Sequence, residues 1–253
     1  MSETLLQTNN LSKSFFGVAA IEDVSIKVHD GELMGLIGPN GSGKTTFFNC
    51  VSGLLRPERG EVLFRGQPIT DWPPHRIALG GISRTFQESR IFSRLTVMEN
   101  MLVSLQEYRD RSLLARVLAT SRVKSFERAG YDRALDLLEM VSLVHLKDRP
   151  AGNLSYGQSK LLGFASALIA EPELLLLDEP AAGINLTLLN DIKSYIQWVN
   201  ADGLTILLVE HNMDVVMDLC RRVIVLDHGR KIAEGTPEEI QNNELVLEAY
   251  FGK

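Results

Sequence analysis

The residues of this chain best suited to chemistry form one glycine-rich run, Gly38-Pro39-Asn40-Gly41-Ser42-Gly43-Lys44-Thr45-Thr46. The run fits the spacing G-x-x-x-x-G-K-[ST], which is typical of a phosphate-binding loop. Such a loop aims successive backbone N–H groups at one point, and the dipole of the following helix favours an anion there. Lys44 would reach the β- and γ-phosphates, and the Thr45 hydroxyl would ligate Mg²⁺. The run predicts a nucleoside triphosphate site; the alternative is a glycine-rich turn with a surface lysine.

A pair of carboxylates forms a second candidate site. Four leucines beginning at Leu174 are followed directly by Asp178 and Glu179. An acidic residue at the end of a buried parallel strand lies where ligands bind in open α/β sheets. We expect Asp178 to hold Mg²⁺ through its water shell and Glu179 to take a proton from the attacking water. Two solvated carboxylates at a strand end are the alternative, and the preceding phosphate loop argues against it.

A third run, Leu154-Ser155-Tyr156-Gly157-Gln158, opens a helix. Ser155 is a good N-cap, and Gly157 leaves backbone donors exposed at the positive end of the helix. Taken alone, the run predicts no more than a capped helix.

The elements around these residues suit them. Residues 32–37 predict a buried strand before the phosphate loop, and residues 46–51 predict the first turns of a helix after it. Most of residues 5–64 predict strands, with clear examples at 23–28 and 61–66. Residues 83–87 predict a strand that ends at the polar Gln87.

The pattern then changes twice. Helices are predicted at residues 102–118, at 126–140 and from about Ser155. Continuous apolar runs follow at residues 173–178, 204–209 and 223–227, as expected of strands buried on both faces of a parallel sheet. Thr236-Pro237-Glu238-Glu239 predicts a further capped helix.

Composition sets limits on function. The chain has 253 residues, of which 45% are hydrophobic and 23% charged, as in soluble globular proteins. Its net charge of -6 argues against a general nucleic-acid binder. Cys50 and Cys220 have no metal-binding or redox spacing, which favours a reducing cytoplasm. We see no secretory signal at the N-terminus, and the longest apolar run, 161–170, is too short to span a bilayer. Any membrane role would therefore come through a partner.

The order of the phosphate loop, Gln87, the run at Ser155, the strand ending in Asp178-Glu179, and His211 resembles the ATPase subunit of an ABC transporter. The resemblance covers nearly the whole chain. It implies an α/β fold: a P-loop NTPase core with a mostly parallel sheet, an N-terminal antiparallel β-subdomain and an inserted α-helical subdomain. Residues 1–253 would be a single nucleotide-binding domain, with the helical subdomain at about 88–165.

The resemblance also implies roles for single residues. Glu179 would be the catalytic base, Gln87 would touch Mg²⁺ and the attacking water, and His211 would sense the γ-phosphate. Ser155 and Gly157 would contact the γ-phosphate of ATP held by the opposite subunit. The residues expected to bind ATP are Phe15, Gly38, Asn40, Gly41, Ser42, Gly43, Lys44, Thr45, Thr46, Ser155, Gly157 and Gln158; those expected to bind Mg²⁺ are Thr45, Gln87 and Asp178. Phe15, with Phe16 as an alternative, is expected to stack on adenine, although core packing would also explain a phenylalanine there.

A finer resemblance is to the ATPase subunits of branched-chain (hydrophobic) amino-acid importers. It is carried by Ser83-Arg84-Thr85-Phe86-Gln87, Leu95-Thr96-Val97-Met98-Glu99-Asn100, Asp178-Glu179-Pro180-Ala181-Ala182-Gly183, Glu210-His211-Asn212-Met213 and Ala249-Tyr250-Phe251-Gly252. Leu186 departs from that family, which usually has proline there, and the stretch after Gln158 lacks the usual arginines.

The implied partners are membrane permease subunits, a second ATPase subunit that is either a copy or a related chain, and, indirectly, a solute-binding protein. The protein would then lie on the cytoplasmic face of the membrane, held there by its partners, and would bind no nucleic acid. Three alternatives remain open: a soluble ABC-type ATPase that acts on DNA or ribosomes, a transporter ATPase for an amide, urea or lipid cargo, and an ATP-binding module with impaired catalysis.

Overall fold

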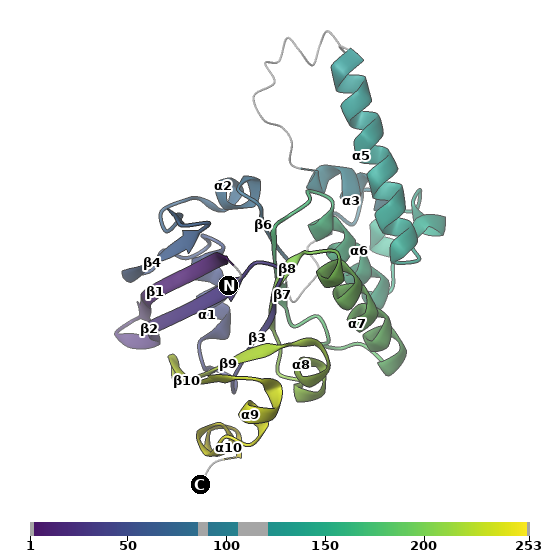
Figure 1. Ribbon diagram of the computed structural model, residues 1–253. Helices are drawn as coiled ribbons and strands as arrows, with labels where there is room; N and C mark the ends of the chain where they lie inside the picture. The colour runs from purple at the N-terminus through teal and green to yellow at the C-terminus, as the bar shows by residue number, and fades with distance from the viewer. Residues whose placement is uncertain (1–2, 86–90, 106–120, 252–253) are drawn as a thin grey trace. The chain divides into compact units, whose positions relative to one another are not determined.

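The computed structural model describes residues 3–85, 91–105 and 121–251 (Figure 1). The chain forms two compact units. The first comprises Met1–Arg84 and Glu173–Lys253, and the second comprises Thr85–Pro172. The second unit is therefore an insertion in the sequence of the first.

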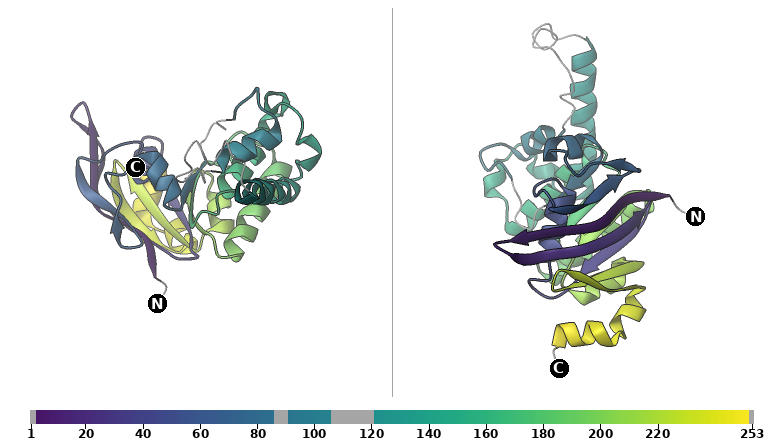
Figure 2. Two further views of the ribbon diagram at one scale, coloured as in Figure 1. Left: turned by 90° about the horizontal axis from the view of Figure 1, so that it is seen from above. Right: turned by 90° about the vertical axis from the view of Figure 1, so that its left-hand side faces the viewer.

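The first unit begins with an antiparallel sheet in the order β2-β1-β4-β5. Strands β1 and β2 are neighbours and form a long hairpin at one edge of this sheet (Figure 2). The strands are β1 (Thr4–Phe15), β2 (Val18–His29), β4 (Arg59–Phe64) and β5 (Gln67–Pro68). The strand predicted at 23–28 lies within β2, where alternating burial places one face against the core. The strand predicted at 61–66 overlaps β4, which ends at Phe64, and a turn follows at Arg65 and Gly66.

The second sheet of this unit has the order β10-β9-β3-β8-β7-β6 and is parallel except for β10. Its strands are β3 (Leu33–Ile37), β6 (Ile82–Arg84), β7 (Leu174–Asp178), β8 (Thr205–Val209), β9 (Arg222–Asp227) and β10 (Arg230–Gly235). Every residue of β3, β7 and β8 is buried, which confirms the expectation drawn from their continuous apolar runs.

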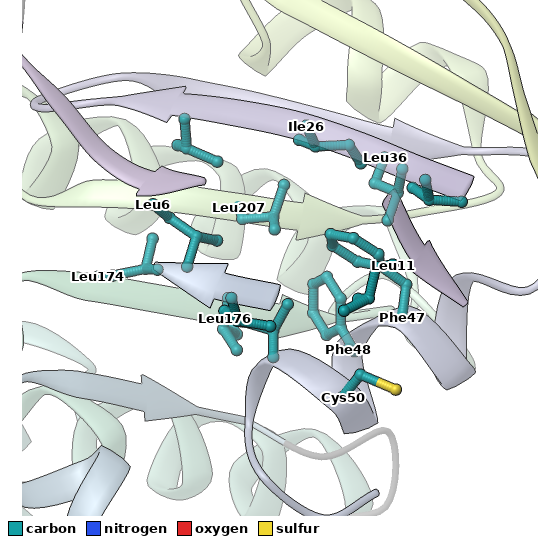
Figure 3. Packing of buried hydrophobic residues seen from close by; sticks show 14 of the residues in the cluster. Leu6, Leu11, Ile26, Leu36, Phe47, Phe48, Cys50, Leu174, Leu176 and Leu207 are labelled. Carbon is teal, nitrogen blue, oxygen red and sulfur yellow. The ribbon is translucent and has the colours of Figure 1, made fainter. Parts of the chain in front are cut away.

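The helices of the first unit are α1 (Lys44–Val51), α2 (Pro74–Leu79), α7 (Leu186–Ala201), α8 (Met213–Leu219), α9 (Pro237–Gln241) and α10 (Glu244–Phe251). The capped helix predicted at Thr236 is α9, where Thr236 and Glu239 form a capping box. A hydrophobic core unites both sheets with α1, and Phe47 and Phe48 of α1 are fully buried in it (Figure 3). The core fixes the start of α1, and with it the phosphate loop.

The second unit is helical. It contains α3 (Val97–Ser104), α5 (Ser121–Met140), α6 (Tyr156–Leu168) and the 3₁₀ turns η1 (Val144–Leu146) and η2 (Ala151–Asn153). Helix α3 packs against both α5 and α6, and Met101, Leu138 and Ala165 are fully buried. The helix predicted to begin near Ser155 is α6, and the one predicted at 126–140 is the C-terminal part of α5.

Of the helix predicted at residues 102–118, residues 102–104 belong to α3. Helix α3 begins at Val97 because Thr96 and Glu99 form a capping box, and it ends at Ser104 with Leu105 extended. Residues 106–118 lie outside the described part of the chain. In the described segments, no helix combines the length and the hydropathy that crossing a bilayer requires.

Candidate active site

The phosphate loop joins β3 to α1 and needs its glycines. Gly38 and Gly43 have φ angles of 150° and 103°. A Cβ atom would lie 2.1 Å from the Leu226 carbonyl oxygen at Gly38 and 2.4 Å from the Ala20 carbonyl oxygen at Gly43. Side chains at these two positions are therefore excluded by neighbouring backbone, and the loop is held against β2 and β9.

The opening of α1 is suited to an anion. Gly43 is its N-cap and brings no side-chain cap, and the first turn carries no acidic residue. Its N-terminal N–H groups and the helix dipole thus favour negative charge. Asn40, Gly41 and Thr45 are exposed, Thr46 is half-buried and Ser42 is buried.

Lys44 is buried in this loop, with only 6% of its surface exposed. Its Nζ donates to the carbonyl oxygens of Gly38 at 2.7 Å and Pro39 at 2.9 Å. Burial lowers the pKa of Lys44, and the negative charges of Glu179 and Asp178 oppose that lowering. The lysine therefore lies within electrostatic reach of both predicted acidic residues.

Asp178 and Glu179 lie at the carboxyl end of β7. Asp178 is buried, and its Oδ2 accepts a hydrogen bond from Nη2 of Arg84 at 2.8 Å. Glu179 has a φ of 47°, and its N–H donates to the Val209 carbonyl oxygen at 2.9 Å. The left-handed backbone at Glu179 marks a sharp turn directly after β7.

His211 follows β8 and lies next to Glu179. Its Nδ1 is 3.9 Å from Oε2 of Glu179 and 4.0 Å from Oε2 of Glu210, and its side chain is 55% exposed. The structure therefore brings together Lys44, Asp178, Glu179 and His211, which the sequence analysis selected separately.

Glu210 is a site residue that the sequence analysis missed. Its fully buried carboxylate accepts hydrogen bonds from the N–H groups of Ala181 at 2.8 Å, His211 at 3.2 Å and Asn212 at 3.3 Å. Burial raises the pKa of Glu210, and these hydrogen bonds oppose the rise. Glu210 ties the loop after β7 to the loop after β8. The available signal was an acidic residue at the end of a fully apolar strand.

Phe15 is the last residue of β1, where it pairs with Val18. Its side chain is 40% exposed, and Nζ of Lys13 lies 5.6 Å from the ring centroid. Phe16 is fully exposed in the hairpin turn. Partial exposure suits a stacking surface, and adenine stacking at Phe15 stays a prediction.

Ser155, Gly157 and Gln158 belong to the second unit. Oγ of Ser155 accepts from the Gln158 N–H at 3.2 Å, and Oε1 of Gln158 accepts from the Ser155 N–H at 2.9 Å. This capping box opens α6 and leaves Ser155 exposed. The Gln158 side chain is therefore engaged in the cap. Gln87 lies outside the described residues.

The donors available for Mg²⁺ are oxygen atoms. Within the described segments, no cluster of three or more histidine, cysteine, aspartate or glutamate side chains could hold a metal ion. The Thr45 hydroxyl and the Asp178 carboxylate nevertheless fit Mg²⁺, which commonly takes one or two protein oxygens together with phosphates and water.

Comparisons with known proteins agree with this geometry. Residues 21–182 match the family model described as ABC transporter, and residues 230–253 match the model described as branched-chain amino acid ATP-binding cassette transporter. The high-affinity branched-chain amino acid transport ATP-binding protein BraF of Pseudomonas aeruginosa is 38% identical, over 100% of both chains. A probable branched-chain amino acid transport ATP-binding protein, LivG of Archaeoglobus fulgidus, is 42% identical over 98% of this chain and 95% of its own.

Solved structures show the same fold. A nucleotide-free ATP-binding cassette from an ABC transporter is 36% identical, with a TM-score of 0.84 over 99% of this chain and 100% of its own. A dimeric bacterial ABC transporter cassette is 25% identical, with a TM-score of 0.78 over 92% of this chain and 99% of its own. The chain belongs to the ATP-binding subunits of ABC transporters, and within them it resembles those of branched-chain amino-acid transport.

Proposed function

We propose that this chain hydrolyses ATP to energise import of branched-chain or other hydrophobic amino acids through separate membrane subunits. The observation that carries the proposal is the meeting of Lys44, Asp178, Glu179 and His211 beside a glycine loop at the carboxyl ends of β3, β7 and β8. Parallel sheets place their ligands at that edge.

The residues divide the chemistry among them. The α1 N–H groups and Lys44 would bind the phosphates, and Glu179 would accept the proton of the attacking water. His211, 3.9 Å from Glu179, would orient that carboxylate and report the γ-phosphate. Bound Mg²⁺ would neutralise phosphate charge, and Thr45 and Asp178, with Gln87, would hold it.

A second ATPase subunit would complete the site. We assign Ser155 and Gly157 to the γ-phosphate of ATP held by that subunit, because exposed Ser155 stands at a helix N-terminus. ATP would favour the closed pair because its γ-phosphate bonds both sides, and hydrolysis would remove that difference. Residues 1–253 would act as a single nucleotide-binding domain.

The names of two relatives support the proposed cargo and location. The names of BraF and LivG specify branched-chain amino acid transport. We extend that cargo to this chain, with permease subunits and a solute-binding protein as partners and a location on the cytoplasmic face of the membrane. Affinity purification from detergent-solubilised cells should recover polytopic membrane proteins. Recovery of ribosomal or DNA-repair proteins without them would contradict the transport assignment.

The hydrolysis assignment has a direct test. Glu179→Gln should retain ATP binding but slow turnover by roughly 10²- to 10⁴-fold, the usual effect of losing a positioned general base. The measurements are phosphate release and binding of a fluorescent ATP analogue. Turnover like that of the wild type would contradict the assignment of Glu179 as the general base.

A further inference from the structure

Arg84 is a buried cation to which the mechanism above gives no role. It ends β6, the edge strand beside β7, and pairs in parallel register with Leu176. Asp178 lies two residues further along β7, and the guanidinium extends to it, with Nη2 2.8 Å from Oδ2. Both side chains are only 8% exposed.

The same guanidinium also binds the helix that follows the phosphate loop. Its Nη1 donates to Oδ1 of Asn49 at 2.8 Å and to Oγ of Ser52 at 2.9 Å. The guanidinium carbon lies 5.4 Å from the centroid of the Phe48 ring. Arg84 therefore joins α1 to the acidic end of β7.

Packing alone does not require this arrangement. Taking two charges out of water is costly, and apolar side chains of similar volume fill such a space at least as well. What the pair changes is the charge beside the phosphate loop. The charge of Asp178 is close enough to Lys44 to oppose the lowering of the lysine's pKa. It is therefore also close enough to repel a polyphosphate bound at Lys44.

We propose that Arg84 is a positioning residue that holds and neutralises the Asp178 carboxylate, so that the polyphosphate of ATP can enter before Mg²⁺ is in place. The inference rests on the proposed nucleotide site. Without Arg84, the phosphates would meet a carboxylate that has lost this buried cation, and their binding would depend more strongly on Mg²⁺.

The test compares nucleotide affinity with and without metal. The dissociation constant of a fluorescent, non-hydrolysable ATP analogue is measured in EDTA and in excess Mg²⁺. For Arg84→Met we expect the affinity in EDTA to fall at least about tenfold, the order of effect of one unit of charge near the phosphates at an effective dielectric constant of about 20, and the affinity in Mg²⁺ to fall clearly less. Arg84→Lys, which keeps the charge, should recover part of the metal-free affinity.

Arg222→Met is the matched control. Arg222 also lies in an ion-pair network, with Nε 2.7 Å from Oε1 of Glu32, but at the opposite end of the parallel sheet. Arg222→Met should lower the free energy of unfolding without changing the ratio of the affinities in EDTA and in Mg²⁺. Equal losses in EDTA and Mg²⁺ for Arg84→Met would show a structural role and overturn the inference, with the nucleotide site left standing. A wild-type chain that fails to bind the analogue would overturn the site and the inference together.

Discussion

At the scale of single residues, the buried carboxylate of Glu210 binds two loops of the proposed active site at once. One carboxylate oxygen accepts from Ala181, two residues after Glu179, and the other accepts from His211 and Asn212. Because all three N–H groups donate to Glu210, the position of His211 relative to Glu179 depends on Glu210. The amide of glutamine could accept on only one side.

We expect Glu210→Gln to lower kcat by about 10- to 100-fold, because a small misplacement of reacting groups is costly. Its affinity for ATP should stay within about twofold of the wild type, because the hydrogen bonds that Glu210 accepts come from Ala181, His211 and Asn212, not from the phosphate loop at 38–46. Steady-state phosphate release and analogue binding measure the two quantities. A matching loss of affinity would place Glu210 in the binding machinery instead.

Glu210 also predicts a pH dependence of stability. Burial raises the pKa of Glu210 above its ordinary value of 4.5. Between pH 4.5 and that raised pKa, the folded chain therefore holds a proton that the unfolded chain releases. This contribution is fully present below pH 4.5 and is lost as pH rises through the folded-state pKa. His211 is the charged side chain that acts on Glu210, with its Nδ1 4.0 Å from Oε2. The pKa of Cys220 is raised to about 12, first by burial and then by Glu210. In urea unfolding, the free energy of unfolding should decline less from pH 4.5 upward for Glu210→Gln than for the wild type.

Lys44 allows a test of binding alone. Lys44→Ala should weaken nucleotide binding about 10- to 100-fold, because it removes a charge-assisted hydrogen bond to phosphate. Lys231→Ala is the control, since Lys231 pairs with Glu234 on β10. If the two variants bind a fluorescent ATP analogue equally well, the phosphate loop is not the nucleotide site.

At the scale of elements, α6 and α3 both begin with a capping box, but the two capping residues are expected to have different roles. Ser155 and Gln158 form the capping box of α6, and Thr96 and Glu99 form that of α3. A cap contributes about 1 kcal/mol whichever helix carries it. Of the two capping residues, only Ser155 is assigned a contact with phosphate. Substitutions at Ser155 and Thr96 can therefore separate helix capping from phosphate contact.

Ser155→Ala should lose about 1 kcal/mol of stability and most of its ATPase activity. Ser155→Asp should keep the cap, because aspartate is a good N-cap, yet lose the activity by repelling the partner's γ-phosphate. Thr96→Ala should lose similar stability while retaining turnover. Urea unfolding and phosphate release distinguish the three; an active Ser155→Asp would reduce Ser155 to a capping role.

The sequence predicted most strands and several helix starts, but it did not predict contacts between residues far apart in the chain. The strand ending at Asp178 was visible because five buried residues in succession leave a continuous apolar run. The start of α3 was not predicted, although the capping box of Thr96 and Glu99 that sets it is visible in the sequence. The Arg84–Asp178 pair joins residues 94 positions apart, and no local pattern encodes such a pairing.

At the scale of the whole molecule, each chain would supply only half of a catalytic site. Lys44 and Glu179 belong to the first unit and Ser155 to the second, and the proposal places Ser155 on the nucleotide of another chain. A complete site then requires two chains, and ATP itself becomes part of the contact between them.

Glu179→Gln with ATP should therefore be a dimer in size-exclusion chromatography with light scattering, because bound ATP persists when hydrolysis is slow. With ADP it should be a monomer, since the differential contact is the γ-phosphate. Adding Ser155→Asp to Glu179→Gln should return the ATP-bound chain to monomer, while adding Thr96→Ala should not. A dimer of equal stability with ATP and ADP would mean that the pair is held by other surfaces, and the split site would have to be abandoned.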